Sequence, residues 1–544
     1  METFSISNLD LVIVLVYLAF IIWWGLKNGK SSDSQSYFLA GRSMPWWVVG
    51  LSLFAASISS TTLIGQSGDA YHTGIAVFNY NLTGIVVMVF FAVFLLPLYI
   101  KSGIFTIPEF LEKRFDRRSR YYFSAICIIG NIFLDAAGAL YAAALIIKLI
   151  LPDADLQLII IVFAIIAASY TIPGGLSSAI NAELIQAVIL ILGSILLTFY
   201  CFQQGGDYFC QLFASGDISV KLIRPLTDTA TPWLGLIVGM PVLGIYFWAN
   251  NQTLVQRVLS SKSVDEGRKG VLFTGFLTML TLFIIAIPGV IARHLFPGLE
   301  KPDMVYPNMV LQLIPVGLLG IMLAALLSAL TSTLSAILNS TSTLFTMDFY
   351  AQYNKNASSQ KLVIIGKITS CVIIVAAALW APQIGKFGSL LKYYQEMLSY
   401  IAPPVVAAFL LGVFNKRVNG NGAFAGLLSG LAIAVVMLFY KNEIFGDMHF
   451  LLIVPFLLAV SGIVIYLVSM CYSKPVAEKL VDTTFSMSEL KAEFRANRAL
   501  VWYKNYHSWA IVLLVLSVLI WIIFLSLIHI SEPTRRRRIS DAVF

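Results

Sequence analysis

The chain has 544 residues, of which 58% are hydrophobic and only 12% are charged, and its mean hydropathy is +0.84. Soluble domains carry about 25% charged residues, so this composition excludes an ordinary soluble protein, a disordered chain and a coiled coil. It predicts an all-α polytopic membrane protein. The net charge of +8 also raises the question of nucleic-acid binding, which the positions of the charges decide.

A hydrocarbon core of about 30 Å needs roughly 20 apolar residues in helical conformation. On that scale we predict fourteen spans. In chain order they are 9–26, 46–65, 78–100, 122–151, 158–170, 176–202, 233–250, 270–296, 316–347, 361–381, 391–414, 422–440, 449–470 and 508–524. The first span is not expected to be a signal peptide, because no basic residue precedes it.

The basic residues between the spans predict the orientation. One set of alternate loops, which begins with Lys27 and Lys30, holds 23 Lys and Arg residues, whereas the other set holds 7. The positive-inside rule makes the richer set cytoplasmic and puts the N-terminus outside the inner (plasma) membrane. The basic excess thus orients the chain in a lipid bilayer, and no nucleic-acid partner is expected.

The segment 525–544 is expected to be foreign to the protein. Its first eleven residues, LSLIHISEPTR, resemble the translation of a transposase-type sequencing adapter. The four arginines 535–538 would also lie on the outer face after fourteen spans, against the positive-inside rule. We exclude this tail from the fold, which lowers the formal charge from +8 to +6, and we expect the native chain to continue beyond Phe524 with other residues.

Two spans contain polar interruptions at matching positions. Five hydroxyl residues lie within 57–62 in one span, and the other ends in Asn250, Asn251 and Gln252. The alternatives are hydroxyls bonded back to their own helix and an ordinary helix end. Counted from 46–65, these spans open two sets of five. Broken helices at corresponding positions indicate a transporter whose binding site lies between inverted repeats.

Carboxylates inside the predicted spans are further candidates, because charges in a bilayer are costly and tend to be functional. Asp135 lies near the middle of 122–151, and the nearest basic residue of that span is Lys148. Glu183 lies in the cytoplasmic part of 176–202. For Glu183, pairing or capping near the interface is an equally good interpretation.

Dispersed motifs show a family resemblance. They are YFLAGRSMPWW at 37–47, GIFTIPEF at 103–110, GGL at 174–176, ELIQ at 183–186, LNSTSTLFTMD at 338–348, QE at 395–396, PP at 403–404 and FLLG at 409–412. In this order they resemble the sodium/solute symporter family, and within it the sodium/glucose cotransporter-like branch. The resemblance runs from the first predicted span to the last.

The resemblance implies a LeuT-type fold, which is a five-plus-five inverted repeat with one extra helix before it and three after it. The corresponding division assigns 1–45 to the extra N-terminal helix and its loop, 46–202 and 203–414 to the two repeats, 415–524 to three extra helices and 525–544 to the tail. This arrangement has fourteen transmembrane helices, the number that hydropathy gives.

The family's sodium site maps onto two of the spans. The resemblance assigns sodium binding to Ala55, Ile58, Ala329, Ser332 and Thr333. It also places Glu183 and Ser335 near the sodium path. Because Ala336 follows Ser335, a second sodium site is doubtful. Sodium is expected as the coupling ion, with no other cofactor.

The substrate positions only partly match the galactose-binding pattern of that branch. Asn251, Gln395 and Tyr80 agree, whereas the span-one Gln is replaced by Thr62 and the inner-gate Tyr by Thr253. We predict that the substrate site consists of Ser57, Ser59, Thr62, Tyr80, Asn81, Asp135, Asn251, Thr278 and Gln395, with Thr253 as the gate. These side chains are mostly hydroxyls and amides, and an anionic solute beside Asp135 would need a counter-charge.

The sequence thus predicts a sodium-driven symporter, not an enzyme, that imports a small neutral polyhydroxylated solute such as a sugar or polyol by alternating access. One alternative is a sodium symporter for an organic acid (sialic acid or a monocarboxylate) or for an amino acid. A membrane sensor with a transporter-like domain is another. The first needs a basic pocket residue and the second a long soluble output domain, and neither is evident in the sequence.

Overall fold

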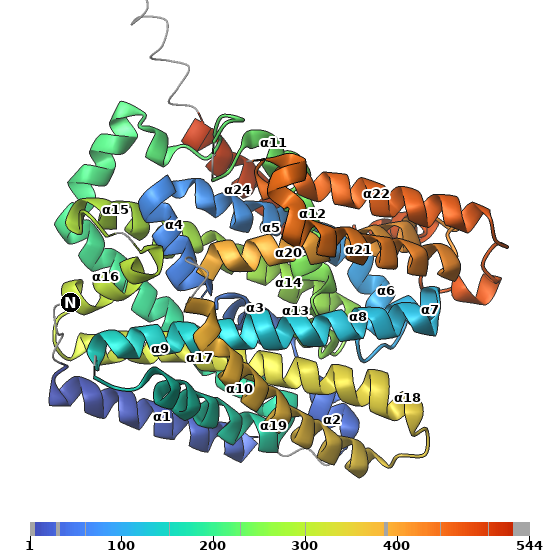
Figure 1. The fold of residues 1–544 in the computed structure, drawn as a ribbon, viewed down its shortest axis with the longest axis horizontal. Coiled ribbons are helices and arrows are strands. Elements are labelled where there is room, and N and C mark those ends of the chain that lie inside the picture. The colour runs from blue at the N-terminus through green and yellow to red at the C-terminus, as the bar shows by residue number, and fades with distance from the viewer. Residues whose placement is uncertain are drawn as a thin grey trace, which may run out of the picture.

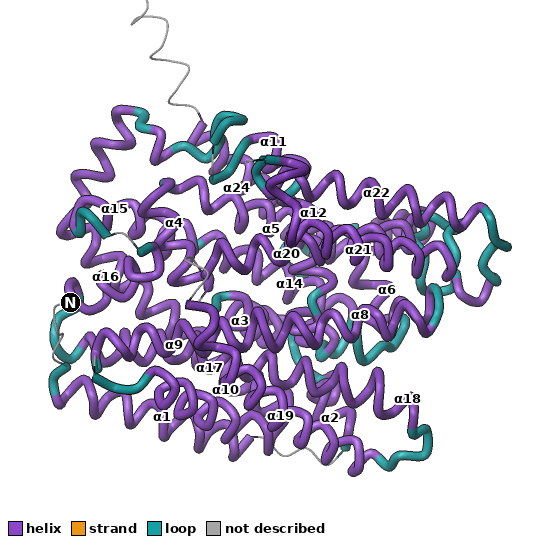
Figure 2. Tube along the Cα trace, in the orientation of Figure 1, coloured by secondary structure: helices purple, strands orange, loops and turns teal. Residues whose placement is uncertain are grey.

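The computed structural model describes residues 6–28, 33–59, 61–151, 153–228, 230–299, 301–385, 390–446, 448–498 and 500–525. Within these ranges the fold is built from helices and connecting loops, without a strand (Figures 1 and 2). Residues 526–544 of the expected tail lie outside the described residues.

The helices of the first half include several short ones at breaks and loops. They are α1 (Asn8–Asn28), α2 (Ser34–Leu39), α3 (Trp46–Ser57), α4 (Gln66–Thr73), α5 (Asn79–Phe90), α6 (Leu96–Lys101), α7 (Ile107–Arg114), α8 (Arg117–Gly130), α9 (Ala137–Ile150), α10 (Leu156–Ser215), α11 (Trp233–Val238) and α12 (Met240–Ile245). Asp116 caps α8, because its carboxylate accepts a hydrogen bond from the Ser119 amide at 3.0 Å.

The second half of the chain also contains short helices between the long ones. Its helices are α13 (Gln252–Leu259), α14 (Val264–Met279), α15 (Ile287–Leu295), α16 (Val305–Leu313), α17 (Leu318–Thr343), α18 (Ala351–Tyr353), α19 (Ser359–Ile384), α20 (Leu390–Phe414), α21 (Gly420–Phe445), α22 (Phe450–Met470), α23 (Met487–Asn497) and α24 (Tyr506–Leu525). The helix α23 lies in the loop 471–507, where the sequence predicts no span.

Wider π-helical turns join several of these helices. They are η2 (Thr61–Gly65), η4 (Phe91–Leu95), η5 (Asn131–Ala136), η7 (Tyr246–Asn250), η8 (Leu282–Ala286) and η10 (Leu344–Tyr350). Tighter 3₁₀ turns are η1 (Ala40–Arg42), η3 (Ile75–Phe78), η6 (Ile218–Val220), η9 (Pro302–Met304) and η12 (Ala477–Lys479). Single π-helical turns inside α-helices are frequent at functional sites, and hydropathy does not predict them.

Twelve described helices are long and apolar enough to cross a membrane, or thirteen if the bent pair formed by α3 and the segment Thr62–Thr73 counts as one span. Each corresponds to a predicted segment. The difference from the fourteen predicted spans arises at 158–170 and 176–202, which lie together in the 60-residue α10. The predicted loop 171–175 is helical except at Gly175, where φ is 63° and ψ is −153°.

Both predicted interruptions are confirmed. The helix α3 ends at Ser57, Ile58 leaves the helical region with φ −85° and ψ 78°, and the chain bends by 60° before α4. The second break is at Asn251, whose extended backbone (φ −72°, ψ 116°) separates η7 from α13. The carbonyl and amide groups freed there need partners other than their own helix.

The helix α17 lies at the centre of the molecule, and nearly all its side chains from Leu319 to Thr343 are buried. It packs against α1, α3, α9, α10, α13 and α19. Figure 1 shows α1, α17 and α19 in the lower part of the view, and α10 packs against all three. The helices α21 and α22 lie at the upper right, and α20, which packs against both of them, lies nearer the centre. The breaks of α3 and η7 therefore occur next to the most buried helix.

Candidate functional site

One cavity collects the predicted substrate residues. It lies where the two broken segments, α5, η5, α14, α17 and α20 meet. All nine predicted substrate residues line it, as does the predicted gate: Ser57, Ser59, Thr62, Tyr80, Asn81, Asp135, Asn251, Thr278, Gln395 and Thr253. Ile58 and Thr333 of the predicted sodium set also line its wall. Residues from seven separate regions of the sequence, between Ala56 and Leu398, thus converge on one cavity.

Some hydroxyls of this wall donate to carbonyls of their own helices, which is the back-bonding arrangement. Ser57 donates to the Phe54 carbonyl at 2.8 Å, and Thr278 donates to the Thr274 carbonyl at 2.8 Å. A hydroxyl has one proton and two lone pairs, so an oxygen that donates backward still accepts from a ligand or coordinates a cation. The back-bonding and ligand-binding interpretations are therefore compatible.

An amide pair forms another part of the wall. Asn81 and Gln66 exchange two hydrogen bonds, of 3.0 and 3.2 Å, and Asn81 also donates to the Thr281 hydroxyl at 2.7 Å. Gln66 was not predicted, because the predicted span ended one residue before it. It lines the cavity together with Thr62, the residue expected in place of the family's glutamine. Gln66 follows Thr62 by four residues, about one helical turn, so the two side chains share a helix face, and this spacing could have identified Gln66.

The break at Asn251 presents its side chain to the cavity. Its amide oxygen accepts a hydrogen bond from the Thr253 backbone at 2.8 Å and so caps α13. The amide nitrogen can still donate. Thr253 donates at 2.9 Å to Ser340 on α17, which itself accepts from Asn131 at 3.1 Å. The predicted gate is therefore held between α13, α17 and η5.

The predicted sodium residues lie where α3 meets α17. Ser332 donates to the Ala55 carbonyl at 3.0 Å, which joins the two helices directly. Thr333 donates to the Ala329 carbonyl at 2.9 Å and so keeps its own lone pairs free. With Ile58 at the break, the set supplies carbonyl and hydroxyl oxygens only, which is the chemistry that a hard cation prefers.

The two residues predicted along the sodium path have partners of their own. Glu183 is fully buried, receives hydrogen bonds from Arg257 at 2.5 and 3.3 Å, and also accepts from Ser52. The ion pair agrees with the interpretation that Glu183 is paired, and the partner, Arg257, belongs to α13. Ser335 accepts from Thr171 at 2.9 Å. Both therefore link α10 to a broken segment or to α17.

Asp135 lies in the π-helical turn η5 and is half-buried at the cavity wall. Tyr394 of α20 forms a hydrogen bond with its carboxylate. Among the described residues that line the cavity there is no Lys, Arg or His. In the described ranges, no three His, Cys, Asp or Glu side chains are grouped so that they could hold a metal ion.

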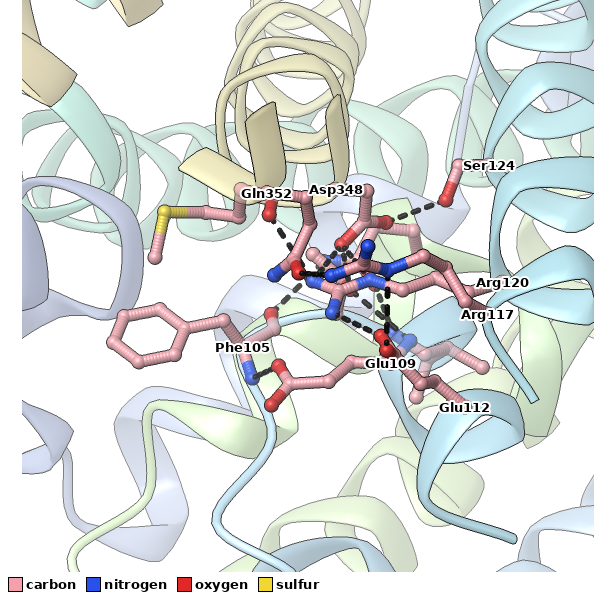
Figure 3. Close-up of polar contacts among 12 residues, drawn as sticks. Phe105, Glu109, Glu112, Arg117, Arg120, Ser124, Asp348 and Gln352 are labelled. Carbon is pink, nitrogen blue, oxygen red and sulfur yellow. Dashed lines mark hydrogen bonds and ion pairs between the residues drawn. The ribbon is translucent and has the colours of Figure 1, made fainter. Parts of the chain in front are cut away.

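A second polar cluster, which was not predicted from the sequence, joins α7, α8 and the turn η10 that follows α17 (Figure 3). The Asp348 carboxylate is fully buried. It accepts hydrogen bonds from Arg120 at 2.6 Å, Ser124 at 2.5 Å and Thr106 at 2.7 Å. Arg120 also pairs with Glu112 at 2.6 Å. The cluster lies away from the cavity, because none of these residues lines it.

Comparisons with known proteins agree on one family. The sequence model described as "Sodium:solute symporter family" matches residues 37–430. The chain is 33% identical to the sodium/glucose cotransporter 1 of Ovis aries over 528 residues, which covers 86% of this chain and 79% of that protein. It is 34% identical to the sodium/glucose cotransporter of Vibrio parahaemolyticus over 468 residues, which covers 80% and 86%.

The fold is similar to that of a solved transporter. A structure described as the substrate-bound outward-open state of a Na⁺-coupled sialic acid symporter superposes with a TM-score of 0.77 at 21% sequence identity, and the match covers 86% of this chain and 99% of that one. At this identity the likeness concerns the arrangement of helices and not the solute.

Proposed function

This chain belongs to the sodium:solute symporter family, and we propose that it imports a neutral polyhydroxylated solute, a sugar or a polyol, together with sodium ions. The family is one of sodium-coupled transporters and not of enzymes. Two relatives about one-third identical are named sodium/glucose cotransporters, and their named substrate class fits the hydroxyl- and amide-rich cavity of this chain.

The observation that carries the proposal is the composition of the cavity wall. Its predicted substrate side chains offer hydroxyl, amide and phenol groups from α3, η2, α5, α14, α20 and the two breaks, and only one carboxylate, from η5. Such groups satisfy the hydroxyls of a polyol, each of which both donates and accepts. Trp248, Phe247 and Tyr80 add flat apolar surface, so the wall presents both apolar area and fixed polar groups, as small-molecule sites do.

Sodium coupling would follow from the contact between α3 and α17. We propose that Ala55, Ile58, Ala329, Ser332 and Thr333 bind the ion. A sodium ion there would replace the hydrogen bond from Ser332 to the Ala55 carbonyl and hold the broken helix against α17. Because coupling free energies are reciprocal, the solute must raise the affinity for sodium by the same factor. A membrane potential of about 100 mV contributes roughly 2.3 kcal/mol per charge carried inward.

The finer architecture is also part of the proposal. If α10 counts as two spans separated at Gly175 and the bent pair counts as one, the twelve candidate spans become fourteen. The repeats would then be 46–202 and 203–414, with 1–45 before them and 415–524 after them. The α3 and η7 breaks are in the first span of each repeat, which supports this division.

The predicted orientation determines which side of the cavity opens to the cytoplasm during transport. With the basic loops in the cytoplasm of a plasma-membrane protein and the N-terminus outside, α13 faces inward. We propose that Thr253 and the Glu183–Arg257 pair close the inner exit, and that Ser335 lies beside the sodium path. Release of the solute and sodium into the cytoplasm would then require these contacts to separate while contacts at the outer side of the cavity form.

The decisive test is uptake into proteoliposomes with an inward sodium gradient, measured across a panel of hexoses, hexitols, inositols and organic acids. We expect sodium-dependent uptake of at least one neutral polyhydroxylated solute, stimulated by an inside-negative potential. A potassium gradient of equal size is the control. Uptake that is equal in sodium and potassium would contradict the proposal.

The alternatives are weaker on the same observations. An organic-acid symporter would need a cationic partner in the cavity, and the described lining has none. A sensor would need a soluble output domain, whereas the segment between α22 and α24 contains only the short turn η12 and α23 in the described part. The panel above includes organic acids so that the first alternative is tested directly.

A further inference from the structure

The buried carboxylates near the core are neutralised in different ways. Glu183 faces the Arg257 guanidinium at 2.5 Å, and Asp348 faces the Arg120 guanidinium at 2.6 Å. Asp135 forms no ion pair in the described part of the chain, and its recorded partner is the Tyr394 phenol. An uncompensated carboxylate in a membrane interior is costly, so its position on a cavity wall needs an explanation.

The surroundings of Asp135 define what can bind there. Tyr394 and Gln395 of α20 and Asn251 at the second break line the adjoining hollow, and Tyr246 of η7 and Cys127 of α8 lie behind it. None of these side chains carries a positive charge. An ionised carboxylate only accepts hydrogen bonds, and one phenol proton satisfies only a part of its lone pairs. The remaining lone pairs of the Asp135 carboxylate can accept hydrogen bonds from a solute in the cavity.

We propose that Asp135 determines the charge selectivity of the transporter: it accepts hydrogen bonds from hydroxyls of the solute and rejects solutes that bear a carboxylate. This inference rests on the proposed function and names the solute class more narrowly. A sugar acid would bring a second negative charge next to Asp135 in a cavity of low dielectric, where like charges repel strongly.

The neighbouring sodium site fits the same assignment. Ile58 and Thr333 line the same cavity as Asp135, so one sodium ion and one carboxylate would make the loaded cavity neutral overall. A neutral solute leaves that balance unchanged, whereas a carboxylate-bearing solute leaves one negative charge uncompensated. Asp135 lies in the turn η5 and lines the cavity, so its carboxylate is within reach of the solute.

The test compares solutes of the same shape that differ in charge. Galactose, methyl galacturonate and galacturonate are measured as substrates and as competitors of sodium-driven uptake, and the corresponding glucose series is measured in parallel. For the wild-type protein we expect galacturonate or glucuronate to bind on the order of 100-fold more weakly than its methyl ester, because like-charge contacts cost several kcal/mol.

Three variants assign this discrimination to one residue. Asp135→Asn should reduce the difference between acid and ester to about threefold or less, a residual of the size that minor steric differences produce. Asp135→Glu should retain most of it. Asp265→Asn, which removes an exposed carboxylate on α14, should change nothing. A thermal unfolding scan of each variant checks that the fold is intact.

The outcomes separate the two claims. Sodium-driven uptake of a neutral sugar with equal affinity for acid and ester overturns the inference alone, and so does a discrimination that survives in Asp135→Asn. If the wild-type protein takes up no neutral sugar or polyol in response to sodium, the proposed function fails and the inference fails with it.

Discussion

The Arg257 guanidinium donates to the Glu183 carboxylate at 2.5 Å, and both side chains are fully buried. Arg257 belongs to α13, which follows the second break, and Glu183 belongs to α10. Ser52 of α3 also donates to Glu183. One ion pair therefore ties three elements together on the α13 side of the cavity, and two of them are parts of the broken segments.

Removing one partner of this pair should be more harmful than removing both. Arg257→Met leaves the Glu183 charge buried and unpaired, and we expect a loss of about 3–5 kcal/mol of stability. The double variant Arg257→Met with Glu183→Leu removes both charges and should recover a large part of that loss. Unfolding of the purified protein in detergent measures both effects.

The control for this experiment is the pair of Lys269 and Asp265 on one face of α14, in which Lys269 Nζ lies 2.6 Å from Asp265 Oδ2 and the aspartate is exposed to solvent. Lys269→Met should cost no more than about 0.5 kcal/mol, because helix pairs of this spacing with a solvated partner contribute little. A double variant that is less stable than Arg257→Met alone would show that Glu183 is stabilised without Arg257.

The sodium site predicts a specific kinetic change. Ser332→Ala together with Thr333→Ala removes two of the five proposed oxygen ligands, so the sodium concentration for half-maximal uptake should rise roughly tenfold or more, equivalent to about 1.4 kcal/mol. Sodium titration of uptake at fixed solute measures this change. Ser342→Ala on the same helix removes a hydroxyl that bonds the Asn339 carbonyl at 3.0 Å, and it should leave the sodium titration as in wild type. An unchanged titration in the double variant would refute the site.

The cluster in Figure 3 predicts an asymmetry between two partners. Arg120→Met leaves Asp348 fully buried without its guanidinium, with an expected cost of about 3–5 kcal/mol. Asp348→Leu leaves Arg120 paired with Glu112 at 2.6 Å, so the cost should be clearly smaller. Thermal unfolding of the two single variants ranks them. The reverse order would mean that the hydroxyls of Thr106 and Ser124 suffice to stabilise the carboxylate.

Sequence patterns were informative wherever the bilayer itself sets the rule. Apolar length located the candidate spans, and the polar interruptions located both breaks, because broken backbone at membrane depth must face protein or a cavity. The predicted substrate residues all line one cavity, although Ser57 and Gln395 are more than 300 residues apart.

The pairings between helices could not be predicted in the same way. Whether Glu183 meets Arg257, or Asp348 meets Arg120, depends on which helices are neighbours and at what height, and hydropathy contains neither. Gln66 was missed for a related reason: apolar length placed the end of the span at Gly65, whereas the bent segment continues to Thr73.

The backbone between the predicted spans 158–170 and 176–202 could not be predicted either, because the chain stays helical through that gap except at one irregular residue, Gly175. Gly175 has φ 63° and ψ −153°, a region that only glycine populates readily. A Cβ there would lie 2.6 Å from the Tyr37 backbone oxygen. Gly175→Ala therefore combines backbone strain of about 1–3 kcal/mol with a steric clash, and it should lower the unfolding temperature strongly.

The matched change is Gly130→Ala in α8, where an added Cβ would meet no atom within 4 Å. Alanine is favoured over glycine in a helix by about 0.5–1 kcal/mol, so this variant should be neutral or slightly more stable than wild type. Because both substitutions add one methyl group, the difference between their unfolding temperatures isolates the conformation and the contact at Gly175. Equal stability of the two variants would mean that the chain can continue through this position without the irregular residue, and the separation of α10 into two spans would lose its physical basis.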